Sequence, residues 1–134
     1  MSVVALPIVF ENTAGIIAAH ADGYALVRYH PVTRRSHDLQ GLLEYLGSFL
    51  ITQGWERILC DARNMQALTN DEQRWVQEQW YPNNVLRPNQ LSTAYLSAQG
   101  TVVHLTLEET KPAAQDVRTF DNLKEAHTYL RSLS

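Results

Sequence analysis

The sequence predicts a single-domain α/β fold. It is a sandwich in which a mixed sheet of about five to six strands packs against three to four helices, mainly on one face. Two observations carry this prediction: three β-prone segments precede the first helical pattern, and helical and strand patterns then alternate. Successive strands pair antiparallel, whereas strand–helix–strand crossovers return the chain in the same direction, so the sheet should begin antiparallel and continue parallel. Because such crossovers are right-handed, the helices predicted over 38–53 and 69–81 should share one face.

The amino-terminal third predicts three strands. A short apolar run covers 6–11, and the segments 16–20 and 24–30 flank the dipeptide Asp22-Gly23. That dipeptide supplies the positive φ angles of a two-residue hairpin turn. We therefore expect a hairpin with its turn at Asp22-Gly23.

The middle of the chain predicts two helices and a central strand. Apolar residues recur at helical spacing over 38–53, and Gly54 stands where that helix should end. The run 57–61 is apolar at three successive positions, which suits a strand covered on both faces. A second helix should begin at Thr69 and stop before Pro82, since proline disfavours helical geometry in the preceding residue.

The carboxyl-terminal third predicts two strands and a last helix, at 91–97, 117–120 and 122–133. The segment 101–110 fits either state, because its apolar residues alternate like a strand while two of them also match a helical step. The expected order is three strands, helix, strand, helix, strand, the open segment, strand and helix.

Composition and charge exclude several classes of function. The chain has 134 residues and a formal charge of 11 minus 14, or −3, and no basic run exceeds Arg34-Arg35, so we expect no nucleic-acid partner. The longest stretch without charged residues, 88–107, is interrupted by polar residues, so we expect no transmembrane segment. A single cysteine, Cys60, cannot form an intrachain disulfide, and no basic residue precedes the first apolar stretch. Both features predict a cytoplasmic protein.

Three stretches of the chain carry a family resemblance. They are "WERILCDARNMQALTNDEQRWVQEQWYP", with a strand ending in Asp and a Trp-bearing helix, then "LSTAYLSAQ", and "VRTFDNLKEAHTYL". In these stretches the chain resembles the SpoIIAA-like branch of the STAS superfamily, small domains related to anti-sigma-factor antagonists and to the cytoplasmic domains of sulfate transporters. The resemblance implies a non-catalytic regulatory or protein-interaction module and a helix within 101–110.

Thr69 has two interpretations. In phosphorylated antagonists of that superfamily, a kinase modifies a Ser at the start of the helix that follows the Asp-ended strand, and Thr69 lies near that position. The chain lacks the Asp-Ser pair and nearby Gly of those switch proteins, while Thr69 and Glu72 match a capping box, so we favour the cap. The candidate switch or partner-binding residues are Asp61, Arg63, Thr69 and Asp71.

Neither Asp61 nor Cys60 has the neighbours of a catalytic group. Asp61 lacks the acidic pair and the late lysine of a phosphorylated receiver, so we expect it to bond loop amides within 63–65 and to pair with Arg63. Arg63 stands too close to Cys60 for a phosphatase loop, and a thiol inside an apolar strand is normally inert. The sequence therefore predicts binding without turnover, and no cofactor.

Two further candidate sites each have a simpler alternative. Arg34, Arg35 and Ser36 precede the first long helix, with Ser36 as its candidate N-cap, and could hold an anion beside the helix amides. Solvated loop charge is the alternative that we favour. Trp75 and Trp80 could line an apolar pocket between sheet and helices, as in a small-ligand or lipid carrier, whereas core packing is the simpler use. A cavity of roughly 300 Å³ or more would favour the carrier.

The histidines predict no metal site. A two-residue turn would place His20 opposite Ala25 and His30 near Gly15, roughly 17 Å apart along the hairpin. His127 lies in an amphipathic segment without His or Cys partners at metal-ligand spacing. We also expect a homodimer, because small domains with exposed edge strands commonly cover them.

Overall fold

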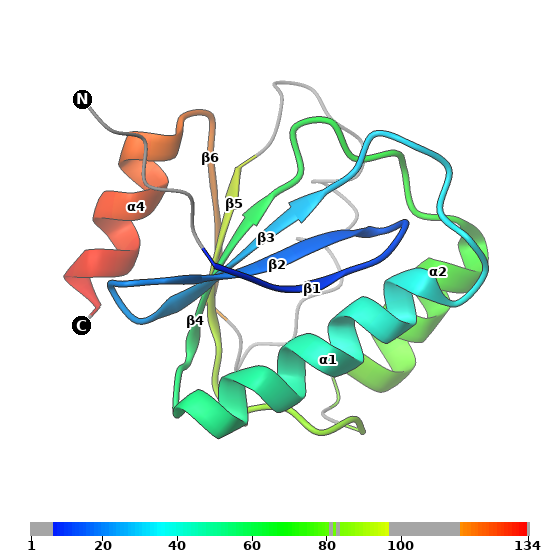
Figure 1. Ribbon diagram of the computed structural model, residues 1–134, viewed down its shortest axis with the longest axis horizontal. Coiled ribbons are helices and arrows are strands. Elements are labelled where there is room, and N and C mark those ends of the chain that lie inside the picture. The colour runs from blue at the N-terminus through cyan, green and yellow to red at the C-terminus, as the bar shows by residue number, and fades with distance from the viewer. Residues whose placement is uncertain (1–6, 81, 83, 97–115, 134) are drawn as a thin grey trace.

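The computed structural model describes residues 7–80, 82, 84–96 and 116–133, and its six strands form one sheet in the order β1-β2-β3-β4-β5-β6 (Figure 1). The strands are β1 Ile8–Glu11, β2 Gly15–His20, β3 Tyr24–Tyr29, β4 Arg57–Asp61, β5 Ser92–Leu96 and β6 Asp116–Phe120. The helices are α1 Asp38–Gln53, α2 Asn70–Trp75, the π-helical turn η1 Val76–Trp80, and α4 Leu123–Ser132. β1 to β3 pair antiparallel and β3 to β6 pair parallel, which confirms the predicted mixed sheet. The segment 101–110 lies outside the described residues.

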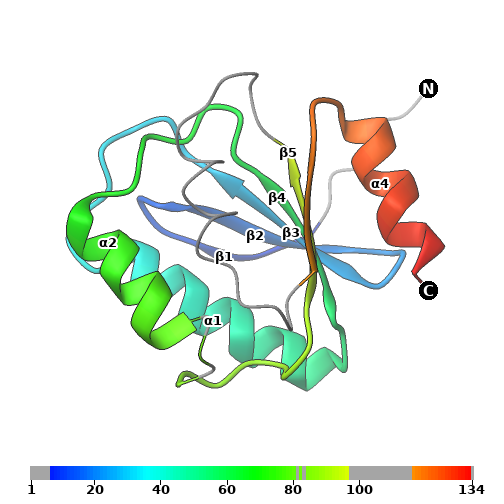
Figure 2. The same cartoon turned by 180° about the vertical axis from the view of Figure 1, so that it is seen from behind.

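The helices cover the sheet on both faces. α1 and α2 lie on the same face, as the right-handed crossovers require for strands that advance in one direction (Figure 2). α4 follows the last strand of the sheet, is not part of a crossover, and packs on the opposite face. Among the described residues, no helix is both long enough and apolar enough to cross a membrane.

Alternating side chains along the strands build two cores. On β4, Ile58 and Cys60 point toward α1 and α2, whereas Leu59 packs with Ala126 and Leu130 of α4. Both faces of this strand are covered, which explains why the three consecutive positions 58–60 are apolar.

The hairpin between β2 and β3 differs from the prediction by one residue. His20 pairs with Tyr24, and Gly15 pairs with Tyr29, so neither His20–Ala25 nor His30–Gly15 is a register pair. The turn has three residues rather than two, and only Gly23 has a positive φ, of 86°. A three-residue turn needs the left-handed conformation at its last position alone, and Gly meets that need without Asp22.

α1 matches its predicted range, with a positive φ of 72° at Gly54 after its last residue. Its Gly47 lies against the loop before β5: a Cβ atom there would stand 2.1 Å from the carbonyl oxygen of Leu86. Gly41 of the same helix has no such neighbour, since the nearest atom, on Asn12, would be 3.8 Å away. The loop packs on α1 because position 47 has no side chain.

The predicted helix over 69–81 is two segments. α2 continues directly into the π-helical turn η1, whose Val76 and Trp80 are buried, while Trp75 is only half-buried. Trp80 also accepts a hydrogen bond from Arg87, whose guanidinium lies 5.1 Å from its ring centre. Trp80 therefore packs in the core, the simpler of the two uses expected for it, and Trp75 lies at the margin of the core.

Candidate functional site

Asp61 lies at the carboxyl end of β4 in a cluster of two arginines. Arg63 donates from Nε at 3.0 Å, from Nη2 at 2.9 Å and from its amide at 3.3 Å, and Arg28 of β3 lies 3.4 Å away. Burial raises the pKa of the Asp61 carboxyl, but the bonds from Arg63 and the charge of Arg28 outweigh burial, and the net pKa is lowered. The expected pairing with Arg63 and the bond from a loop amide are confirmed, and the carboxylate is held ionised by its neighbours.

Thr69 forms the predicted capping box. Its Oγ1 accepts from the Glu72 amide at 3.1 Å, and Glu72 Oε1 accepts from the Thr69 amide at 2.9 Å. Both bonds satisfy groups that the first turn of α2 would otherwise leave open. Asp71, two residues after Thr69 in the same first turn, has a side chain that is 91% exposed and lies 3.4 Å from Arg74.

Arg34 is an internal side chain and not part of an exposed anion site. Its side chain is 4% exposed, and its guanidinium donates two bonds of 2.8 Å to the carboxylate of Glu72. It also donates to the carbonyl oxygens of Gln66 and Ala67, at 3.2 and 3.0 Å. These bonds tie the loop before α1 to the start of α2.

Ser36 is not the N-cap of α1, which corrects that prediction. The N-cap is His37, whose φ is 71° and whose side chain makes no capping bond. Ser36 instead contacts His37, with 3.1 Å from Oγ to Nδ1. Asp38 is turned away toward Thr13, which donates its amide at 3.1 Å and its hydroxyl at 2.5 Å. The successive residues Ser36, His37 and Asp38 therefore do not form the Ser-His-Asp relay that would activate a serine nucleophile.

Several of these residues meet at one groove between the amino ends of α1 and α2, with a volume of about 590 Å³. We call it the α1–α2 groove. Its lining residues are Arg34, Arg35, Ser36, His37, Leu39, Gln40, Thr69, Asp71, Glu72, Arg74, Trp75, Glu78 and Gln79. It unites the candidate anion-binding residues with Thr69, Asp71 and Trp75, which the sequence had suggested for separate purposes. Asp61, Arg63 and Trp80 do not line it.

The cavity that Trp80 lines is small. It measures about 30 Å³ and lies between Trp80, Tyr29, Tyr95 and the buried face of α1. This is about the volume that one water molecule occupies in liquid water. Trp75 does not line this cavity, so Trp75 and Trp80 do not share it.

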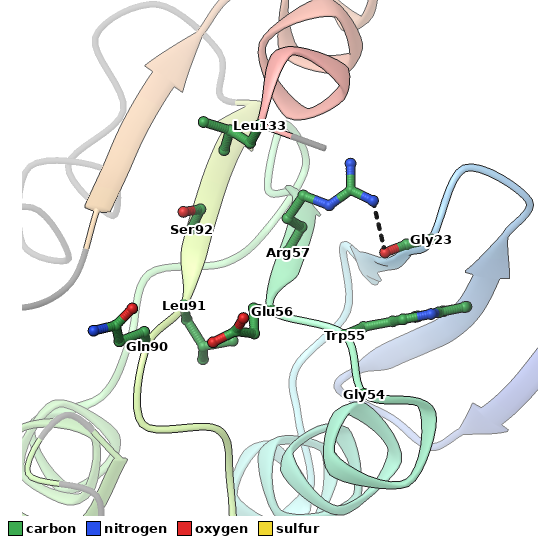
Figure 3. Close-up of a pocket in the computed structure, with 9 residues that line it drawn as sticks. All are labelled: Gly23, Gly54, Trp55, Glu56, Arg57, Gln90, Leu91, Ser92 and Leu133. Carbon is green, nitrogen blue, oxygen red and sulfur yellow. Dashed lines mark hydrogen bonds between the residues drawn. The ribbon is translucent and has the colours of Figure 1, made fainter.

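A second opening, of about 470 Å³, lies at the amino ends of β4 and β5 (Figure 3). Glu56 and Arg57 are the charged residues of its lining. The guanidinium of Arg57 donates to the carbonyl oxygens of Leu130, Asp22 and Gly23, at 2.8, 2.7 and 3.2 Å. These bonds connect α4 to the hairpin turn, so Arg57 has a structural role.

Cys60 is buried between the sheet and the helices, with 4% of its surface exposed. Burial raises the pKa of its thiol to about 12, so the thiolate is scarcely populated near neutral pH. The position agrees with the packing role that the sequence indicated.

The histidines separate into groups that the sequence did not indicate. His30 pairs with Glu11 at one end of the hairpin, at 3.1 Å. At the other end, His20 and Asp22 meet His127 of α4, whose Nε2 lies 3.2 Å from Asp22 Oδ2. The pattern gave no signal for this meeting, because it depends on where α4 lands on the sheet.

A comparison of the chain with known proteins finds no family model and no curated protein that matches it.

Proposed function

We propose that this protein is a non-catalytic interaction module, similar in role to the SpoIIAA-like domains of the STAS superfamily, and that it binds a partner protein in the α1–α2 groove. The observation that carries the proposal is the convergence of Arg35, His37, Asp71, Arg74 and Trp75 on one open groove of about 590 Å³.

The chemistry of the groove suits a protein segment better than a small apolar ligand. Leu39 and Trp75 are the only apolar residues of its lining, but the aliphatic parts of the longer side chains make its exposed surface more apolar than polar. Charged groups of Arg35, Asp71 and Arg74 lie on the same lining, and protein interfaces likewise combine an apolar core and a tryptophan or arginine anchor with polar groups. The fitting partner segment carries an acidic side chain toward Arg35 and a basic one toward Asp71 and Glu78.

Three observations support binding without turnover. The thiol of Cys60 is buried, with its pKa raised to about 12. The carboxylate of Asp61 is engaged by two arginines, and Ser36 lacks an acidic residue behind His37. A nucleophile needs an adjacent base that is itself held in place, and none of these groups has one.

The alternative, a carrier of a small apolar ligand or lipid, has less support. The void lined by Trp80 measures about 30 Å³, against the roughly 300 Å³ that a ligand pocket requires.

The edge strand β1 does not favour homodimerisation, because it has four residues and an irregular register with β2. Short, bulged edge strands discourage pairing. A cytoplasmic location belongs to the proposal, because the single cysteine is a buried free thiol.

The test is site-specific photo-crosslinking in the native cell. A photoreactive amino acid at position 71 or 74 should capture one defined protein in a 1:1 adduct, and one at position 124 of α4 should not. With that partner purified, Trp75→Ala should weaken binding by about 30-fold, the scale of an interface anchor. Asp71→Arg should also weaken it while leaving the capping box intact, and Lys124→Ala should change nothing.

Two results would overturn the proposal. One is an adduct formed equally well from position 124. The other is turnover of a phosphate ester, thiol substrate or acyl ester by the purified protein that Asp61→Ala abolishes while partner recovery survives.

A further inference from the structure

The turn between β2 and β3 and the helix α4 bring three metal-binding side chains together. His20 ends β2, Asp22 lies in the turn, and His127 lies on α4, which packs beside this end of the hairpin (Figure 1). One ligand atom from each of the three lies within 4.8 Å of the other two. We propose that His20, Asp22 and His127 form a site for a divalent cation of the zinc type. The site stands apart from the α1–α2 groove and does not depend on its function.

The distances between the side chains are near those of a zinc site. Three ligands on the corners of a tetrahedron around Zn²⁺ stand about 3.3 Å apart, given metal–ligand distances of about 2.0 to 2.1 Å. Asp22 Oδ2 lies 3.2 Å from His127 Nε2 and 3.9 Å from His20 Nδ1. Asp22 also donates its amide to His20 Nδ1 at 3.0 Å, so coordination through that nitrogen replaces this bond and needs a small rotation of the His20 ring.

Tyr24 contacts the ring nitrogen of His127 that faces away from Asp22, as outer partners of metal-binding histidines do. Its hydroxyl lies 2.6 Å from His127 Nδ1, on the side of the ring away from Asp22. In the tautomer that protonates Nδ1, this nitrogen donates to Tyr24 and leaves Nε2 free for a metal. The same tyrosine stacks on His20, with ring centres 4.3 Å apart, and therefore holds both imidazoles.

The donor set selects the class of metal. Two imidazoles and one carboxylate suit Zn²⁺, Cu²⁺ or Ni²⁺ better than Mg²⁺ or Ca²⁺, which prefer oxygen ligands alone. Arg131 is the competing cation, with its Nε 3.7 Å from Asp22 Oδ2. Its side chain is 66% exposed and can turn into solvent, whereas the two histidines are 23% and 28% exposed and stay in place. A bound metal would join α4 to the hairpin, beside the bonds that Arg57 already makes there.

The experiment titrates ZnCl₂ into metal-free protein by calorimetry and repeats it with single variants. The wild type should bind one equivalent. His20→Gln and His127→Gln should each weaken binding by at least about 100-fold, because a direct ligand contributes no less than an outer partner, whose loss costs 10- to 100-fold. Tyr24→Phe should weaken it by about 10-fold. His30→Gln is the matched control, since His30 has a carboxylate partner but belongs to no three-residue metal-ligand cluster in the described part of the chain, and the affinity of this variant for Zn²⁺ should equal that of the wild type.

Pulsed electron paramagnetic resonance of the Cu²⁺-loaded protein gives an independent readout. The wild type should show two coordinated imidazoles, and each histidine variant should show one. Thermal unfolding in EDTA establishes that each variant is folded without metal. If a histidine variant does not fold, Asp22→Asn, which changes a ligand in the exposed turn, takes its place. The proposal is overturned if the wild type binds no Zn²⁺, if the His20 and His127 variants bind as well as wild type, or if His30→Gln weakens binding equally.

Discussion

Removing one partner of the Arg34–Glu72 ion pair, which lies in the lining of the α1–α2 groove, should cost several kcal/mol, because the other charge would remain largely buried and unpaired. The side chains are 4% and 18% exposed and share two bonds of 2.8 Å. Removing one partner of a buried pair costs 3–5 kcal/mol, and the partial exposure of Glu72 places Arg34→Ala at about 3 kcal/mol. Glu72→Ala also removes half of the capping box, which brings its cost to about 4 kcal/mol.

The assay is urea unfolding of wild type, both single variants and the double variant. At a slope of about 1.5 kcal/mol per M, a loss of 3 kcal/mol lowers the midpoint by about 2 M. The double variant should cost less than the sum of the single variants, with a coupling of roughly 2 kcal/mol, since the two residues share their bonds. Glu72→Gln is the milder variant if Glu72→Ala does not fold.

The exposed pair Asp71–Arg74 is the matched control for this experiment. Its side chains are 91% and 65% exposed, so Asp71→Ala should leave the midpoint unchanged within error. If Arg34→Ala costs less than about 1 kcal/mol, or if the two single effects add without coupling, the pair is not buried as described and Arg34 becomes available to an anion.

The same pair predicts the direction of a pH effect. Burial raises the pKa of Glu72, but the bonds from Arg34 and from the Thr69 amide outweigh burial, and the net pKa is lowered. A carboxyl whose pKa is lower in the folded state contributes stability above its unfolded pKa, about 4.3, and loses it as pH falls through the folded value. Wild type should therefore lose stability below about pH 4.3 more steeply than Glu72→Gln. Parallel curves for the two proteins would remove this assignment.

Three further predictions concern single positions. Gly47→Ala should cost about 2 kcal/mol through overpacking against the loop before β5, whereas Gly41→Ala in the same helix should be neutral or stabilise by up to about 1 kcal/mol; equal midpoints would show that the loop does not pack there. Thr69→Ala should cost about 1 kcal/mol through loss of the cap, against little change for Thr52→Ala, and coincident urea midpoints at equal slope would favour the switch interpretation of Thr69. Cys60 should resist a thiol reagent in native protein and react fully in urea, because burial raises its pKa to about 12; rapid native labelling would contradict the burial.

The sequence could predict the features that depend on neighbouring residues. The range of α1 and its end at Gly54, the range of β4 and the capping box at Thr69 each follow from residues close together in sequence, and each is observed. The hairpin was misplaced by one residue, because Asp22-Gly23 fits both a two-residue turn and the last two positions of a three-residue turn. Local sequence does not distinguish these turns, whereas the paired strands do.

Features that depend on distant residues could not be predicted in this way. Arg34 was expected in an exposed loop, since nothing near it in sequence indicates a partner, yet Glu72 buries it. His127 was assigned no metal partner for the same reason, and it meets His20 only because α4 packs on the face opposite α1. The partners of these side chains are thus decided by the topology of the fold, which brings together residues that are distant in sequence.

The position of the α1–α2 groove follows from that topology. α1 begins after the carboxyl end of β3 and α2 begins after the carboxyl end of β4, and these two strands are parallel neighbours. Right-handed crossovers place both helices on one face, so both helix starts must lie at the same edge of the sheet (Figure 1). Ligands of open α/β sheets bind at this edge, because the loops there are free to vary without disturbing the strands. The loop residues Arg35 and His37 and the α2 residues Asp71 and Arg74 therefore meet as a consequence of the strand order, which is why the groove is the favoured place for a partner.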